Sequence, residues 1–375
     1  MTTKNLLMWD ESLFRDPDVF EIDYVPDQFE FRDTQMRELA FQIRPGFRGG
    51  RPLNTVCKGL PGTGKTTSVR KLFGEVEESN KKLVPVHVNC QIDNTKYAII
   101  SQIYRKLSGH LPPASGTSFK QVFDSIAHIL KEEEIVLVVA LDDANYLLYE
   151  NEINRVLYTL LRSHETYEGT RIGVIVIISD MDVDMTRVID ARVASVFQPT
   201  EIYFSPYGHD EVHEILKARV MQGFFPNVIS DELLSVVVEH TLNAGDIRVG
   251  LDLLKRAALN AERATRRQID REDINKAFEV SRFLHLAHTI KVLKEEERQI
   301  LRALAEISPV MSEMTMGEAH KSIQEKSKIG YTRFYEIIQK LDAVRIINLH
   351  YREGRGRTRL VTFRYDPKTV LQYLT

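Results

Sequence analysis

The sequence is poor in cysteine and has no long apolar run. Its two cysteines, Cys57 and Cys90, are too few for a disulfide framework or a four-cysteine zinc site, and we expect both to be small buried apolar side chains. The longest apolar runs, 135–141 and 172–178, are far shorter than the roughly 20 residues that span a bilayer. The N-terminus also lacks the pattern of a signal peptide. We therefore expect a soluble, cytoplasmic protein with no membrane contact.

The sequence also lacks a strong excess of charge of either sign. Fifty Lys and Arg against 53 Asp and Glu give a net charge of -3, which excludes a uniformly basic protein that coats nucleic acid. The charge is unevenly distributed, however. Residues 321–375 contain 12 basic and five acidic residues, a net charge of +7, so residues 1–320 carry −10. A basic C-terminal end remains compatible with binding to DNA.

The first 206 residues alternate between strand-like and helical patterns. Five short apolar runs predict strands at 54–58, 83–89, 135–141, 172–179 and 202–204. Helical spacing lies between them, and it is clearest at 94–108, 118–131 and 151–164. Strands that alternate with helices are typical of a parallel sheet in an α/β fold. We therefore predict a parallel-sheet domain over residues 1–207.

Two further domains are predicted after Pro206. Amphipathic helical patterns at 210–223, 231–243, 246–264 and 271–283 predict an all-helical domain over residues 208–286. Residues 287–375 show three helical patterns, at 293–307, 315–326 and 331–342, followed by strands at 346–351 and 359–365. Three helices and a two-stranded hairpin form the order of a winged helix-turn-helix domain.

The segment GLPGTGKT fits the phosphate-binding pattern G-x-x-x-x-G-K-[ST] between a strand and a helix. Its glycines allow positive-φ conformations in which backbone N–H groups converge on phosphate oxygens. Lys65 would add a charge to the β and γ phosphates, and the Thr66 hydroxyl would bind Mg²⁺. The alternative is a chance glycine turn. The predicted ATP- or ADP-binding residues of this segment are Gly59, Leu60, Pro61, Gly62, Thr63, Gly64, Lys65, Thr66 and Thr67.

Acidic side chains follow two of the predicted strands. The run IVLVVALDDAN ends in Asp142, which would hold Mg²⁺ together with Thr66, and Asp143, which would orient or polarise the attacking water. The next strand ends in Ser179 and Asp180, and a polar side chain there could contact the γ phosphate or the water. The alternatives are a solvated turn after the first strand and an ordinary polar pair after the second.

The C-terminal helix 331–342 has one apolar and one polar face. Phe334, Ile337, Ile338 and Leu341 should face the core, whereas Tyr331, Thr332 and Arg333 near its start could contact base edges in the major groove. The following hairpin carries Arg352, Arg355, Arg357 and Arg359 around two glycines, a composition that suits a minor groove. The alternative is a winged helix that binds proteins and has a solvated basic face.

Together these segments resemble the archaeal DNA replication initiators of the AAA+ class, which are related to the eukaryotic origin recognition complex and the cell-division-control helicase loader. The resemblance rests on GLPGTGKT with LDDAN, on GDIR in a helical lid, and on the C-terminal winged helix. The N-terminal segment that contains DYVPDQFEFRD is similar to the family as well, so the likeness covers essentially the whole chain.

The resemblance implies a nucleotide site and a set of partners. Tyr24, Val25, Pro26 and Arg32 would line the adenine and ribose pocket, Tyr207 would also contact the nucleotide, and Arg248 would be the sensor-2 arginine. The stretch 95–109 would be an insertion that touches DNA. The implied partners are double-stranded origin DNA and the replicative helicase. The protein would be a monomer in solution that can assemble on DNA, and it would be associated with the nucleoid.

The sequence departs from this family's pattern at three positions. The usual catalytic Glu is Asp143, the usual sensor-1 Asn is Asp180, and Arg192 is the remaining arginine-finger candidate because Val196 stands where a second arginine is expected. These departures indicate a slow ATPase in which the nucleotide acts as a conformational switch. Two alternatives to the initiator are a signal-transducing P-loop ATPase with a winged helix that regulates transcription, and a purely structural nucleotide-binding protein. A principal initiator and a divergent paralogue both fit the sequence.

Overall fold

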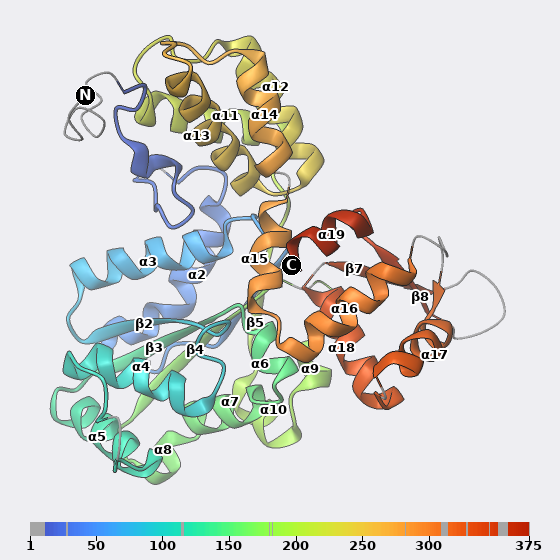
Figure 1. Cartoon of the computed structure of the whole chain (residues 1–375). Helices are drawn as coiled ribbons and strands as arrows, with labels where there is room; N and C mark the ends of the chain where they lie inside the picture. The colour runs from blue at the N-terminus through green and yellow to red at the C-terminus, as the bar shows by residue number, and fades with distance from the viewer. Residues whose placement is uncertain are drawn as a thin grey trace. The chain divides into compact units, whose positions relative to one another are not determined.

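The chain folds into two compact units, Met1–Ser281 and Arg282–Thr375 (Figure 1). The computed structural model describes residues 12–27, 29–113, 116–179, 181, 183–281, 283–308, 314–327, 329–344, 346–351 and 359–374.

The first unit is built on a five-stranded parallel sheet with the strand order β2-β3-β4-β1-β5. The strands are β1 (Thr55–Gly59), β2 (Leu83–Asn89), β3 (Val136–Asp142), β4 (Arg171–Ile178) and β5 (Thr200–Phe204). All five predicted strands are confirmed, each within two residues at its ends. Every residue of β3 is buried, because helices cover both faces of a parallel sheet. The sheet therefore brings the ends of β1, β3 and β4 to one edge.

Two helical layers enclose this sheet (Figure 1). One face packs against α2 (Asp33–Ile43) and α3 (Lys65–Ser79). The other face packs against α4 (Lys96–Ser108), α5 (Phe119–Glu132), α7 (Ile153–Leu161) and α10 (Ala191–Phe197). Shorter helical turns are η2 (Arg44–Arg48), α6 (Asn145–Tyr149), α8 (Ser163–Thr166) and α9 (Met185–Val188). The sequence patterns did not predict α2, whose buried apolar residues are only Leu39 and Ile43.

The helical part of the first unit packs against the N-terminal segment of the same chain. Its helices are α11 (His209–Gly223), α12 (Asp231–Ala244), α13 (Ile247–Arg263) and α14 (Arg271–Ser281). Phe20, in the turn η1 (Pro17–Phe20), packs on Phe224 with ring centroids 4.5 Å apart. A side chain at Gly223 would overlap Phe20, because a Cβ there would lie 2.3 Å from its ring. The segment that precedes Tyr24 is thus fixed to the helical lid.

The second unit combines helices with a small antiparallel sheet. Its elements are α15 (Leu284–Val292), α16 (Glu295–Ile307), β6 (Met314–Thr315), α17 (Met316–Ser327), α18 (Tyr331–Ala343), β7 (Ile347–Tyr351), β8 (Arg359–Phe363) and α19 (Pro367–Tyr373). The strand order is β6-β8-β7. The four side chains of α18 that were predicted to face the core are all buried. A buried ion pair, Lys340 with Glu297 at 2.7 Å, joins α18 to α16.

The two cysteines agree with the sequence-based expectation. Cys57 and Cys90 are free and buried, and burial raises the pKa of both thiols. In the part of the chain that the structure describes, no helix is long and apolar enough to cross a bilayer.

A substitution at Gly250 in α13 would test how tightly the lid helices are packed. A Cβ at this position would lie 2.3 Å from Thr241 Oγ1 on α12. We expect Gly250→Ala to lower the free energy of unfolding by about 1–3 kcal/mol, because overpacking outweighs the better helix propensity of alanine. Gly74→Ala in α3 is the matched control, since no described atom lies within 4 Å of its added Cβ. It should stabilise the protein by up to about 1 kcal/mol. Urea unfolding measures both, and equal stabilisation by the two variants would contradict this account.

Candidate nucleotide-binding site

The phosphate loop runs from the end of β1 to the start of α3 and depends on two glycines in left-handed conformations. Gly62 has φ +72° and Gly64 has φ +87°. A Cβ on Gly62 would lie 2.2 Å from Asp246 Oδ1, and one on Gly64 would lie 2.5 Å from the Tyr207 hydroxyl. Glycine is therefore required at both positions for conformation and for space. The lid, through Asp246, lies directly against the loop.

Lys65 is a buried cation at the first position of α3, with 5% of its surface exposed. Its ammonium group donates hydrogen bonds to the carbonyl oxygens of Gly59 and Leu60, each at 2.8 Å. Burial lowers the pKa of Lys65 to about 8. A phosphate group at the N-terminus of α3 would add a negative charge close to this ammonium group. The geometry of the loop therefore fits a nucleotide polyphosphate.

Asp142 lies beside the loop with both carboxylate oxygens in hydrogen-bonding contacts. Its Oδ1 accepts from the Thr66 hydroxyl at 3.1 Å and from the Asp143 N–H at 3.1 Å. Its Oδ2 lies 2.9 Å from His87 Nε2 on β2. The structure thus brings together Thr66 and Asp142, the two predicted magnesium ligands. A hydroxyl and a carboxylate are oxygen donors of the kind that Mg²⁺ prefers, so the residues present fit this ion.

Asp143 follows Asp142 in a left-handed conformation, with φ +51°. Aspartate tolerates this conformation better than most residues that have a side chain. Burial, with the charge of Asp142 as a second cause, raises the pKa of Asp143 to about 6. The charges of Lys65 and Arg248 oppose this increase. The second acid of the motif therefore lies within the same electrostatic cluster as the loop lysine and the lid arginine.

Arg248 is paired with the N-cap residue of its own helix. Asp246 caps α13, and its carboxylate accepts hydrogen bonds from Arg248 Nε, at 2.9 Å to Oδ1, and from Arg248 Nη2, at 2.5 Å to Oδ2. The charge of Asp246 raises the pKa of Arg248. Because Asp246 also covers Gly62, the predicted lid arginine does lie near the phosphate loop. The sequence patterns did not identify Asp246 as part of this contact.

Arg32 joins three segments on the other side of the loop. Only 2% of its surface is exposed. Its guanidinium donates to the carbonyls of Thr63 (2.9 Å), Ser205 (2.7 Å) and Phe31 (2.7 Å). It also lies 3.7 Å from the centroid of the Tyr207 ring. Arg32 thus links the N-terminal region, the phosphate loop and the segment after β5.

Tyr24 contacts Arg219, a lid arginine that is not among the predicted site residues. Arg219 on α11 is 8% exposed, and its guanidinium lies 4.6 Å from the Tyr24 ring centroid. Its Nη1 is buried and makes no hydrogen bond to any residue that the structure describes. Val25 and Pro26, the next two predicted pocket residues, are partly buried and buried. Arg219 occupies an apolar position of α11, spaced with Val212 and Leu216. This interruption of the apolar face was a signal that could have revealed it.

Three other residues were predicted to contribute to the site, and the structure describes two of them, Ser179 and Arg192. Ser179 follows β4 directly and is partly buried, whereas Asp180 lies outside the described residues. Arg192 on α10 is exposed and pairs with Asp190 at 3.0 Å. Its contact is therefore with its own N-cap residue, and its role as an arginine finger stays a prediction.

The predicted DNA-contacting residues fall partly within the described structure. Tyr331, Thr332 and Arg333 are exposed at the start of α18, as expected. Arg333 is paired with Glu296 at 2.8 Å and with Glu336 at 3.0 Å. Arg359 begins β8 and is partly buried. Arg352, Arg355 and Arg357 lie outside the described residues.

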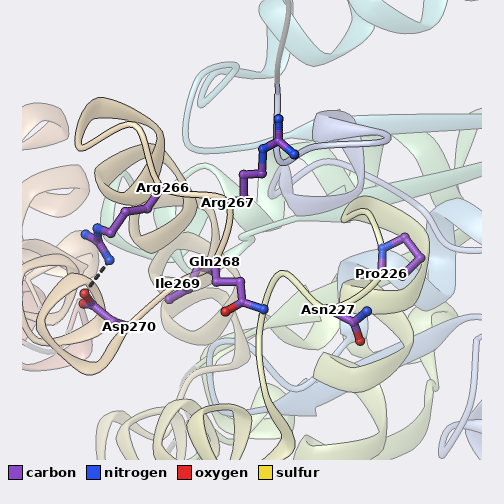
Figure 2. A pocket seen from close by; sticks show the side chains of 7 residues that line it. All are labelled: Pro226, Asn227, Arg266, Arg267, Gln268, Ile269 and Asp270. Carbon is purple, nitrogen blue, oxygen red and sulfur yellow. Dashed lines mark hydrogen bonds and ion pairs between the residues drawn. The ribbon is translucent and has the colours of Figure 1, made fainter.

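A separate open pocket, of about 470 Å³, lies in the lid (Figure 2). Its lining residues are Pro226, Asn227, Arg266, Arg267, Gln268, Ile269 and Asp270. Arg266 is already neutralised, since it pairs with Asp270 and with Asp273. The pocket lies beyond the C-terminal end of α13, and a helix of 17 residues spans roughly 25 Å from the end that carries Asp246. We assign it no part in the nucleotide site.

A parallel sheet, a phosphate loop after its first strand and a helical lid against that loop define a nucleotide-binding P-loop ATPase of the AAA+ class. Residues 49–184 match the AAA domain family, and residues 213–279 match the Cdc6 AAA+ ATPase-type lid domain. The sequence is 46% identical to ORC1-type DNA replication protein 2 of Methanosarcina acetivorans, over 100% of this chain and 99% of the relative. It is 45% identical to ORC1-type DNA replication protein 3 of Haloarcula marismortui, over 98% of each chain. The chain belongs to the family of ORC1-type DNA replication proteins, which confirms the resemblance.

Solved structures share this fold. The Aeropyrum pernix ORC1 protein in complex with DNA superposes with a TM-score of 0.75 at 24% identity, covering 98% of this chain and 97% of that one. The Aeropyrum pernix ORC2 protein in its ADPNP-ADP complexes gives a TM-score of 0.64 at 22% identity, covering 97% of each chain. At these identities the likeness concerns the fold.

Arg32 allows a test of how the site is held together. We expect Arg32→Met to lower the free energy of unfolding by about 3 kcal/mol and to weaken nucleotide binding, because the carbonyls that it pairs would be left without donors. Arg32→Lys should recover little, since one ammonium group lacks the planar fork of guanidinium. Arg37→Met and Arg37→Lys are controls on the exposed side of α2. Urea unfolding and titration with a fluorescent nucleotide measure the effects, and an Arg32→Lys protein that behaves like the wild type would refute this prediction.

Proposed function

We propose that this protein is an ATP-binding replication initiator that recognises double-stranded origin DNA and helps to recruit or load the replicative helicase. The observation that carries the proposal is the contact between Asp246 of the lid and Gly62 of the phosphate loop. A nucleotide bound in the loop would act directly on the lid through this contact. The full-length similarity to ORC1-type replication proteins supports the assignment of that switch to replication.

The nucleotide would be held by three groups of residues. Tyr24, Val25, Pro26, Arg32 and Tyr207 would surround the base and ribose, and the phosphate loop would bind the phosphates. Thr66 and Asp142 would hold Mg²⁺, which neutralises charge on the β and γ phosphates when it is bound. Asp143 would orient the attacking water and accept its proton.

Arg248 would make the switch sensitive to the γ phosphate. Arg248 forms an ion pair with Asp246, whose carboxylate lies against Gly62 of the loop. A γ phosphate would be a second anion that competes for the same guanidinium, so ATP and ADP would favour different lid positions. Ser179, Asp180 and Arg192 complete the proposed catalytic set, and the substitutions at positions 143 and 180 make hydrolysis slow.

We expect slow single-turnover hydrolysis that depends on Asp143. Asp143→Asn should lower the rate by at least about 100-fold, because the amide cannot accept a proton. Its affinity for ATP should stay close to that of the wild type. Rapid quench with radiolabelled ATP measures the rate, and filter binding measures the affinity. Wild-type turnover as fast as that of an efficient AAA+ motor would disprove the switch.

DNA binding is assigned chiefly to the C-terminal part of the chain. We propose three domains, an ATPase domain over 1–207, a lid over 208–286 and a winged helix over 287–375. The helices α16, α17 and α18 with the antiparallel sheet β6-β8-β7 support the last of these. The exposed start of α18 would read the major groove, and the arginines after β7 would enter a minor groove. The segment 95–109, which includes α4, would contribute a second DNA contact.

The remaining partners and states are also proposals. The protein would be a monomer in solution that assembles on DNA, in association with the nucleoid, and the helicase would be its protein partner. The relatives that match over the full length are named as replication proteins, which supports this function over transcriptional regulation.

Footprinting on genomic fragments tests the function. We expect the wild type to protect repeated sites near a replication origin, with patterns that differ between ATP and ADP. The Lys65→Ala variant should give one pattern with both nucleotides, because it lacks the loop cation. Protection confined to promoters would favour the transcription regulator instead.

Variants in the C-terminal hairpin separate DNA contact from nucleotide binding. We expect Arg355→Ala with Arg357→Ala to weaken duplex binding and to reduce the slope of log affinity against log salt by about 1.8, or about 0.9 for each arginine that no longer neutralises a phosphate. The charge-matched control is Arg155→Ala with Lys276→Ala, two exposed residues of the first unit. Fluorescence anisotropy at several salt concentrations measures the slopes. A slope equal to that of the control pair would count against the hairpin as a DNA-binding element.

A further inference from the structure

Strand β2 places a histidine beside the carboxylate of Asp142. His87 pairs with Ala140 in the register of β2 and β3, and Asn89 pairs with Asp142. Side chains alternate along a strand, so His87 shares a face with Leu83, which packs in the same apolar cluster as Leu72 of α3. An apolar residue would suit this face as well. The sequence instead has an imidazole that points to the side of the sheet on which the phosphate loop lies.

The hydrogen bonds at Asp142 define what this imidazole does. Thr66 and the Asp143 N–H both donate to Oδ1, each at 3.1 Å, and His87 Nε2 lies 2.9 Å from Oδ2. An ionised carboxylate can only accept hydrogen bonds, so His87 donates its Nε2–H, and the neutral imidazole is sufficient for this. The side chains of His87 and Asp142 are 18% and 6% exposed. The carboxylate is therefore held from two sides, with Oδ2 fixed by β2 and Oδ1 turned toward Thr66.

We propose that His87 is a positioning residue that orients Asp142 for magnesium binding, an inference that rests on the proposed function. Without the imidazole, the carboxylate keeps its contacts on Oδ1 but can rotate about them. Hydrogen-bond partners of metal ligands fix ligand orientation, and their removal typically costs 10–100-fold in metal affinity or activity. In this proposal His87 acts through Asp142 and makes no direct contact with the nucleotide or the attacking water.

Metal binding to the nucleotide complex tests this role, with Mn²⁺ as the probe and electron paramagnetic resonance as the readout. We expect His87→Phe, which keeps a ring but removes the donor, to raise the Kd for Mn²⁺ in the ATP complex roughly tenfold. His87→Gln, which keeps an N–H donor, should stay within about threefold of the wild type. ATP affinity measured in EDTA should be the same for all three proteins. Thr66→Ala is the positive control, because it removes a proposed ligand.

Failure of the proposed function and failure of the role of His87 give different results. A wild-type protein that binds no Mn²⁺ with ATP would contradict the proposed function itself. A His87→Phe protein that binds Mn²⁺ as the wild type does would overturn the role of His87 alone. Loss of ATP affinity in EDTA would overturn it as well, since His87 would then support the fold of the loop. If His87→Phe does not melt cooperatively, His87→Ala replaces it with the same expected values.

Discussion

The nucleotide site depends on buried opposite charges at the carboxyl edge of the parallel sheet. As whole residues, Lys65 and Asp142 are 5% and 4% exposed. Burying single charges of this kind costs several kcal/mol unless they are paired or hydrogen-bonded. The chain meets this requirement with loop carbonyls around Lys65 and with Thr66 and His87 around Asp142. These contacts join the start of α3 to the first residues of the phosphate loop and to the end of β3.

The lid is connected to this edge at two places that are distant in the sequence. Asp246 touches the phosphate loop, and the N-terminal segment is packed on the lid through Phe20 and Phe224. Tyr24, which follows that segment, contacts Arg219 of the lid. A base held by Tyr24 and phosphates held by the loop would therefore experience the same lid movement. This arrangement supports the proposed nucleotide-dependent switch.

Asp143, the proposed catalytic acid, has an unusual backbone conformation. The residue lies at φ +51°, a conformation that aspartate tolerates because its short side chain can hydrogen-bond locally. Burial raises its pKa to about 6. Its side chain is shorter than that of glutamate, which supports the proposal of slow hydrolysis. In the second unit, Arg333 is proposed to contact DNA, but its charge is neutralised in this structure by ion pairs with Glu296 and Glu336.

The sequence by itself determined where the five strands of the first unit occur along the chain. It also determined the phosphate loop, the two acids after β3 and the core face of α18. These features follow from local rules, since apolar periodicity, glycine conformation and motif spacing act over a few residues. Tertiary structure alone decided the contacts of His87, Arg219 and Asp246, because each depends on a partner from another element. Tertiary structure also decided that the N-terminal segment packs on the lid, although the domain boundaries predicted from the sequence place this segment in the ATPase domain. Long-range packing selects such partners, and no short-range pattern encodes them.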